Sequence, residues 1–193
     1  MKSILFPLGD YTKEEARRMA RENNLPVAQK PGSQEICFLP DPDYREFLKN
    51  RCSTKVKPGP IVDKNGNLLG WHKGIAFYTI GQREGLGLAK GYPLHIVKMQ
   101  KKDNKIIVGR KEDVYSRICF VKRPHYLCGP IKNKVVLKVK IRYNHKETEA
   151  RCLPYKSGLK IIFDQPQLAI TPGQSAVLYD HDQIIAGGII EIH

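Results

Sequence analysis

The spacing of apolar residues near the amino terminus follows the period of an α-helix. In residues 12–24, TKEEARRMARENN, apolar side chains recur every three or four positions. They form a narrow stripe that consists of Ala16, Met19 and Ala20. Thr12 precedes the stripe and Glu15 follows three residues later, which is the spacing of a capping box. The pattern predicts a helix that begins directly after Thr12.

Proline and acidic residues predict a second helix. Asp41 precedes it, and Pro42 then takes the first helical position, where no backbone N–H group is needed. Alternatively, Asp43 is the cap and Glu46 pairs with it. In both cases the helix ends near Arg51. Its buried face is predicted to consist of Tyr44, Phe47 and Leu48.

From residue 57 onward the apolar period drops to two, which is the period of β-strands. Residues 61–70, IVDKNGNLLG, predict a hairpin with Asn65-Gly66 at its turn, where positive φ is needed. Residues 94–110 predict a second hairpin that turns at Asp103-Asn104. Two successive hairpins indicate a small antiparallel β unit.

The clearest alternation lies in residues 134–143, KVVLKVKIRY. One face is expected to point inward: Val135, Leu137, Val139, Ile141 and Tyr143. The other face is expected to point outward: Lys138, Lys140 and Arg142. Further strands are predicted at 148–152, where the alternation turns Cys152 to the apolar side, at 159–164 and at 175–192.

These elements predict a mainly β protein with a short α-helical N-terminal segment. A small central β-domain is followed by an antiparallel β-barrel, because several short strands separated by Gly, Pro and Asp turns are typical of barrels or sandwiches. We place soft boundaries near residues 56 and 112. The predicted parts are therefore residues 1–56, helical and carrying a cysteine loop, residues 57–112, the central β-domain, and residues 113–193, a six-stranded barrel.

The distribution of charge along the chain indicates a class of binding partner. The 193 residues contain 33 Lys and Arg against 19 Asp and Glu, a formal net charge of +14. The excess is uneven, with +3 on residues 1–57 and +11 on residues 58–193. Such asymmetry favours a polyanion, nucleic acid first, as the partner of the C-terminal part, although a solvated surface explains it equally well. We expect a cytoplasmic protein without a membrane partner, because no apolar run approaches the roughly 20 residues of a membrane helix and no secretory signal is present.

We expect no disulfide framework, because the number of cysteines, five, is odd, no pair has the C-x-x-C spacing, and a cytosolic chain of this size rarely contains one. A zinc site at Cys119, His125 and Cys128 matches no common finger, so we predict no metal site. Cys37 lies between two apolar residues, just before a predicted helix start and downstream of Lys30. A nearby cation or helix N-terminus would activate its thiolate, whereas the apolar flanks favour a buried structural cysteine. The remaining cysteines are predicted to be structural: Cys52, Cys119, Cys128 and Cys152.

Residues 78–93, YTIGQREGLGLAKGYP, contain four glycines but match no phosphate-binding loop. Two interpretations stay open. The segment is a glycine-rich bulge and turn region, or it is a surface loop that lies against nucleic acid or closes over an active site.

Four stretches taken together resemble the tRNA-specific 2-thiouridylases of the MnmA/TrmU family. They are residues 6–38, which contain KPGSQEICF, residues 78–88, YTIGQREGLGL, residues 140–144, KIRYN, and residues 165–191, which contain TPGQS. They occur in family order along essentially the whole chain. The resemblance implies that the chain is the C-terminal portion of such an enzyme.

The resemblance also implies chemistry. Family members begin with an ATP-pyrophosphatase domain, which would bind ATP with Mg and carry a first catalytic cysteine, and this chain contains neither. Cys37 matches the cysteine persulfide that transfers sulfur to C2 of the ATP-activated wobble uridine. The first cysteine would then form a disulfide with Cys37, and a persulfide sulfur donor protein would recharge it. The family usually has Asp where Gly32 stands.

The remaining matches concern the anticodon arm of tRNA. Arg142, Tyr143 and Gln174 match tRNA-contact positions, and Lys138 and Lys140 on the outward face of the same strand would add attraction for phosphate. We expect the chain alone to be inactive, because nothing in it binds ATP. The alternatives are a non-enzymatic RNA-binding β-barrel module, and a cysteine hydrolase, for which no histidine stands near Cys37 in the sequence.

Overall fold

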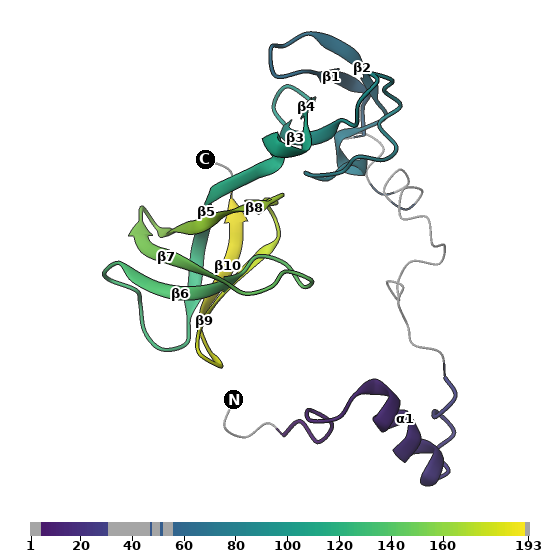
Figure 1. Ribbon diagram of the computed structural model, residues 1–193, viewed down its shortest axis with the longest axis vertical. Coiled ribbons are helices and arrows are strands. Elements are labelled where there is room, and N and C mark those ends of the chain that lie inside the picture. Colours follow the sequence, from purple (N-terminus) through teal and green to yellow (C-terminus); the bar gives the residue numbers. More distant parts are fainter. Residues whose placement is uncertain (1–4, 31–46, 48–50, 52–55, 192–193) are drawn as a thin grey trace. The chain divides into compact units, whose positions relative to one another are not determined.

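A computed structural model describes residues 5–30, 47, 51 and 56–191 of the chain. It divides into two compact units, Met1–Phe47 and Leu48–His193 (Figure 1). The second predicted helix and the Cys37 loop lie outside the described residues, except that Phe47 and Arg51 are helical.

The first unit contains helix α1, Lys13–Glu22, whose start is confirmed as predicted. The Oγ1 atom of Thr12 accepts a hydrogen bond from the Glu15 N–H group at 3.3 Å. In return, Oε2 of Glu15 accepts one from the Thr12 N–H group at 2.7 Å. The helix ends two residues before the predicted limit, because Asn23 caps it.

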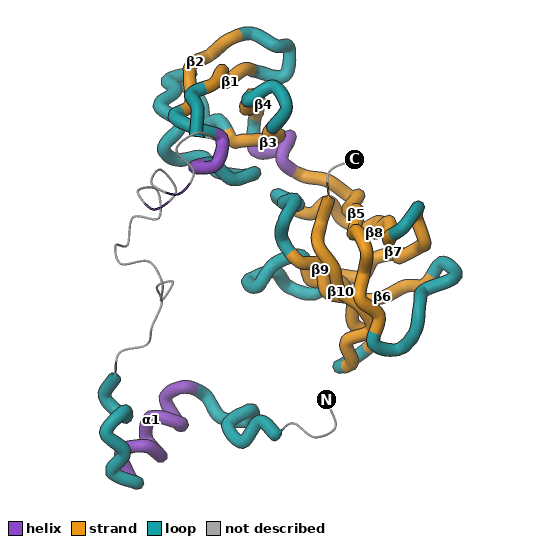
Figure 2. Tube along the Cα trace, turned by 180° about the vertical axis from the view of Figure 1, so that it is seen from behind, coloured by secondary structure: helices purple, strands orange, loops and turns teal. Residues whose placement is uncertain are grey.

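A four-stranded sheet opens the second unit (Figure 2). Its order is β2-β1-β4-β3, with the outer pairs antiparallel and β1 parallel to β4. The strands are β1, Gly59–Val62, β2, Leu68–His72, β3, His95–Gln100, and β4, Lys105–Gly109. Two short 3₁₀ helices accompany them: η1, Ile75–Phe77, and η2, Lys111–Val114. The sheet is therefore mixed, which hairpin patterns alone do not predict.

Both predicted hairpin turns of this sheet are confirmed. Gly66 has a φ of +88° and Asn104 a φ of +47°. The first turn is wider than a two-residue turn, because Asp63 Oδ1 accepts hydrogen bonds from the N–H groups of Asn65 and Asn67, each at 2.9 Å. Asn104 also binds the residue that precedes β1, since its Nδ2 donates to the Pro58 carbonyl oxygen at 2.9 Å.

Six antiparallel strands close into a barrel, which confirms the predicted fold class. They are β5, Tyr115–Tyr126, β6, Val135–Lys140, β7, Thr148–Tyr155, β8, Gly158–Leu168, β9, Ser175–Asp180, and β10, Gln183–Glu191. The ring order is β10-β5-β8-β7-β6-β9. Side chains at alternate positions along the strands fill the interior of the barrel, among them Phe163, Leu159, Ile161, Leu178 and Val139. Because the ring is closed, each of its six strands is paired on both sides.

The cysteines in the described part divide between core and surface. Cys152 faces the core, as predicted, and is fully buried, and Cys119 is 1% exposed. Burial raises the pKa of the Cys119 thiol to about 12, with the nearby Cys152 adding to the effect, and burial raises the pKa of Cys152 to about 12. The prediction that Cys128 is structural is wrong, because this thiol is exposed in the β5–β6 connection. No group of three His, Cys, Asp or Glu among the described residues could hold a metal ion.

Candidate functional site

Strand β6 ends at Lys140, three residues earlier than its alternation suggested. Ile141 still points into the core at 2% exposure. The chain then turns, and the His145 N–H group donates to the Arg142 carbonyl oxygen at 3.1 Å. The prediction that Tyr143 faces inward is therefore wrong: its side chain is 90% exposed at the tip of this turn. An exposed aromatic ring is the group that can stack on an unpaired base.

Two side-chain hydrogen bonds hold this turn against the end of β8. Arg142 Nη1 donates to the Leu168 carbonyl oxygen at 3.1 Å. His145 Nε2 lies 2.8 Å from Oε1 of Gln167. Gln167 is buried, and its Nε2 donates to the Gln165 carbonyl oxygen at 2.7 Å. The turn is thus fixed at both of its ends.

Gln174 comes from a second turn, between β8 and β9. Its N–H group donates to the Thr171 carbonyl oxygen at 3.2 Å, and its carbonyl oxygen accepts from the Ile190 N–H group at 2.8 Å. Gly173 precedes it with a φ of +91°. Backbone bonds therefore hold the segment while the Gln174 residue remains exposed.

The two turns meet at a surface cavity of about 380 Å³. It is lined by Lys140, Arg142, Tyr143, Gln174, Ser175, Val177 and Tyr179. The fold thus brings together all three residues that match tRNA-contact positions, Arg142, Tyr143 and Gln174, and one of the two lysines predicted on the outward face, Lys140. Lys138 does not line the cavity, but it is exposed and lies directly opposite Tyr179 in the β6–β9 register. Residues opposite each other in a ladder share a face, so Lys138 lies beside the cavity.

Sequence reasoning missed Ser175, Val177 and Tyr179. A signal was present, because these residues alternate along β9 with Ala176 and Leu178, both of which are fully buried. The alternation identifies the outer face of β9. It cannot identify β6 as the neighbour of that face, since the pairing joins segments about 40 residues apart.

The cavity is cationic and aromatic. Lys140 Nζ lies 5.9 Å from the centroid of the Tyr143 ring, within the range of a cation–π contact. The described residues of the lining include two cations, two tyrosines and one amide, and none of them is a carboxylate, histidine or cysteine. Such a set can bind phosphate, stack on a base and form hydrogen bonds with a base edge.

Cys37 lies outside the described residues. Upstream, the Lys30 carbonyl oxygen accepts a hydrogen bond from Arg17 Nη2 at 3.0 Å. That contact ties the end of the first described segment back to α1. The role of Cys37 stays a prediction.

Three family models match successive parts of the chain. Residues 1–41 match the tRNA methyl transferase HUP domain, residues 45–110 the tRNA methyl transferase PRC-barrel domain, and residues 116–190 the aminomethyltransferase beta-barrel domain. The second and third matches coincide with the small sheet and the barrel, respectively.

Similar proteins are named tRNA-specific 2-thiouridylases. One from Caldanaerobacter subterraneus subsp. tengcongensis is 48% identical over 193 residues, which cover 99% of this chain and 53% of the relative. One from Moorella thermoacetica is 47% identical over 189 residues, covering 97% of this chain and 53% of the relative. One from Acetivibrio thermocellus is 43% identical over 193 residues, covering 99% and 54%. The chain spans about half the length of these relatives.

Proposed function

Because the chain belongs to the tRNA-specific 2-thiouridylase family, we propose that it supplies the tRNA-binding barrel and the sulfur-carrying cysteine of such an enzyme. The enzyme would replace the C2 oxygen of the wobble uridine by sulfur. The observation that carries the proposal is the single cavity at which Lys140, Arg142, Tyr143 and Gln174 meet.

The cavity suits an unpaired RNA loop better than a duplex. Tyr143 projects into solvent, where it can stack on a base that has left its helix. Arg142 uses one nitrogen on the Leu168 carbonyl, so its remaining N–H groups can reach a phosphate. Gln174 can donate to and accept from a base edge or a ribose. The anticodon arm of tRNA presents such a loop, and we propose it as the bound part.

Sulfur transfer is assigned to Cys37. In the proposed step, the outer sulfur of a Cys37 persulfide forms a bond to C2 of the activated uridine, and the activated oxygen leaves. A second thiolate, from a part of the enzyme outside this chain, then attacks Sγ of Cys37. The S–S bond breaks, its electron pair stays on the sulfur now held by the uridine, and a disulfide with Cys37 remains. A persulfide sulfur donor protein would load the next sulfur atom after reduction of that disulfide.

Activation of the uridine by ATP with Mg stays an expectation from the resemblance. The described residues include no cluster that could hold a metal ion, and we assign no activation step to this chain. The expectation that the 193-residue chain does not thiolate RNA alone is tested by supplying it with ATP, Mg²⁺, a sulfur donor and tRNA. Formation of 2-thiouridine would contradict it.

The sulfur role is tested directly on the chain. After treatment with inorganic polysulfide and alkylation, peptide mass spectrometry should find one added sulfur atom on Cys37, and none there in Cys37→Ser. In the full-length enzyme, Cys37→Ser should abolish thiolation while tRNA affinity is retained. Full thiolation by Cys37→Ser would refute the assignment.

A non-enzymatic RNA-binding module is the second candidate. It is favoured by the fact that the barrel forms a closed fold with its own cationic cavity. Tight tRNA binding together with an unreactive Cys37 would select this candidate.

A further inference from the structure

The glycine-rich segment of the small sheet forms a loop with a fixed base. The Gly81 N–H group donates to the Ile96 carbonyl oxygen at 2.8 Å, and the Ile96 N–H group donates to the Gln82 carbonyl oxygen at 3.0 Å. The Gln82 side chain accepts from the Thr79 N–H group at 3.0 Å and donates to the Glu84 carbonyl oxygen at 2.9 Å. These bonds fix the two ends of the loop of residues 83–94, at Gln82 and at Ile96.

Apolar side chains fix the rest of the loop to the sheet core. Leu86 and Leu94 are buried in the same cluster as Ile61. Leu88 packs over β2, where a Cβ atom added at Gly70 would lie 2.7 Å from Leu88 Cδ2. Glycine at position 70 thus permits the close approach. Apolar packing therefore holds the loop against the sheet.

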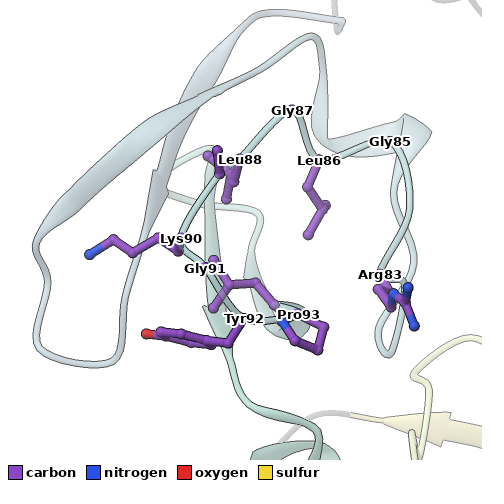
Figure 3. A pocket seen from close by; sticks show the side chains of 11 residues that line it. Arg83, Gly85, Leu86, Gly87, Leu88, Lys90, Gly91, Tyr92 and Pro93 are labelled. Atoms are coloured by element: carbon purple, nitrogen blue, oxygen red, sulfur yellow. The ribbon is translucent and has the colours of Figure 1, made fainter.

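This loop surrounds a cavity of about 580 Å³, lined by Arg83 and residues 85–94 (Figure 3). In Figure 3 the Leu86 side chain points inward, Arg83 lies at one side, and Lys90 and Tyr92 lie at the other. Gly87 and Gly91 have positive φ, and no atom of the described part of the chain lies within 4 Å of a Cβ added at either position. At these two positions the backbone itself is open to a ligand.

The charged residues around the cavity indicate which class of ligand it can bind. Arg83 and Lys90 are both exposed, and no carboxylate, histidine or cysteine is found among the described residues that line the cavity. Two carboxylates lie close by: Glu84 follows Arg83 in the chain, and Asp63 is near enough to Lys90 for this cation to help lower the Asp63 pKa. The lining cations therefore attract anions.

Tyr92 adds an aromatic surface. Its side chain is 47% exposed, and the guanidinium carbon of Arg110 lies 5.3 Å from its ring centroid. The cation–π contact holds the ring at the rim while leaving about half of the residue to solvent. Cations on both sides of an open cavity together with an aromatic ring form the arrangement that binds single-stranded nucleic acid.

We propose that the loop of residues 83–94 is a second RNA-binding surface, separate from the barrel cavity. Arg83 and Lys90 contact phosphodiester groups of the bound RNA, and Tyr92 packs against a base or a ribose. This inference rests on the proposed function, in that it takes RNA as the substrate. It assigns the phosphodiester backbone, rather than a free nucleotide, because the cavity is open along the loop and its cations lie on opposite sides.

The test measures binding of fluorescently labelled, unfractionated tRNA to the 193-residue chain over a series of salt concentrations. In the double variant Arg83→Ala/Lys90→Ala, affinity at low salt should fall about tenfold, and the slope of log affinity against log salt should shrink by about 1.5, since two phosphate contacts are lost. The matched control is Lys101→Ala/Lys102→Ala in the β3–β4 turn, which removes the same charge from the same sheet. It should change both quantities clearly less. The charge-conserving Arg83→Lys/Lys90→Arg variant should retain most of the binding, and thermal melts check that all variants fold.

Each outcome decides the proposal. Equal losses in the loop variant and the control would overturn it, since only net charge would then matter. If the parent chain were found to bind ATP, and the loop variant lost that binding while its tRNA binding stayed unchanged, the proposal would also be overturned and the cavity would be a mononucleotide site. Parallel measurements on Arg142→Ala/Tyr143→Ala keep the two surfaces apart. Loss there alone supports the barrel and overturns the loop proposal, whereas loss in the loop variant alone supports the loop and removes the barrel cavity from the proposed function.

Discussion

His145 Nε2 and Gln167 Oε1 lie 2.8 Å apart, so a histidine of the β6–β7 turn is joined to a buried glutamine of β8. The glutamine Nε2 already donates to the Gln165 carbonyl oxygen, which assigns Oε1 as the acceptor. His145 therefore carries its proton on Nε2. Its Nδ1 atom is buried and has no hydrogen-bond partner among residues 5–30, 47, 51 and 56–191. The pair fixes the turn that presents Tyr143.

His145→Ala should weaken tRNA binding about three- to tenfold, because loss of one hydrogen bond worth about 1 kcal/mol lets the turn leave β8. His145→Gln keeps a side-chain N–H donor and should recover part of the affinity. Gln167→Ala should cost a similar amount, and the double variant no more than either single one. Additive losses would show that the two residues act separately. Hydrogen exchange of the His145 amide reports loosening of the turn independently of RNA.

Tyr143→Ala should reduce tRNA affinity about five- to 150-fold, which corresponds to about 1–3 kcal/mol for one stacked base. Tyr143→Phe keeps the ring and should bind almost as the parent chain does. Because the side chain is 90% exposed, neither variant should lower the melting temperature. Equal affinity of the alanine and phenylalanine variants would exclude stacking.

Arg142→Ala should weaken tRNA binding and reduce its salt dependence by about one phosphate contact. The same change removes the hydrogen bond to the Leu168 carbonyl oxygen. Arg142→Lys separates the two effects, since lysine keeps the charge but not the planar fork. If the salt dependence of Arg142→Ala equals that of the parent chain, Arg142 does not contact phosphate.

Thiol alkylation should distinguish the barrel cysteines. Burial raises the pKa of Cys119 and of Cys152 to about 12, so near neutral pH neither forms an appreciable amount of thiolate. Cys128 is exposed and should react with iodoacetamide in the native protein. Peptide mass spectrometry after a short pulse measures each site. Rapid labelling of Cys119 or Cys152 would indicate that the barrel opens.

Asp113 gives the small sheet a pH dependence. Lys64 Nζ lies 2.6 Å from its Oδ1, and the Arg110 N–H group donates to its Oδ2 at 2.8 Å. The Lys64 hydrogen bond is the main cause that lowers the pKa of Asp113 below its ordinary value of 3.8. The stabilisation is present above that value and is lost as the pH falls through the lower pKa of the folded state. Asp113→Asn should therefore destabilise the chain by about 1 kcal/mol at pH 7, and the difference from the parent chain should disappear in acid. A constant difference down to pH 2 would contradict this.

Some elements could be predicted from the sequence because neighbours along the chain determine them. The Thr12–Glu15 capping box spans three residues, and positive φ at Gly66 follows from the turn between two short strands. The alternation of Leu137 and Val139 also identified their buried face. By contrast, residues 115–126 gave no regular alternation, yet they form β5, which pairs with both β8 and β10.

The sequence by itself determined the helix start, the hairpin turns and the mainly β class, because short-range sterics and periodicity decide these features. Only the tertiary structure decided that Tyr143 points into solvent and that Gln174 lies beside it. Alternation cannot show where a strand stops, and β6 stops at Lys140 because the next residues bond to the end of β8. The site depends on barrel closure between β6 and β9, a pairing that no local pattern specifies.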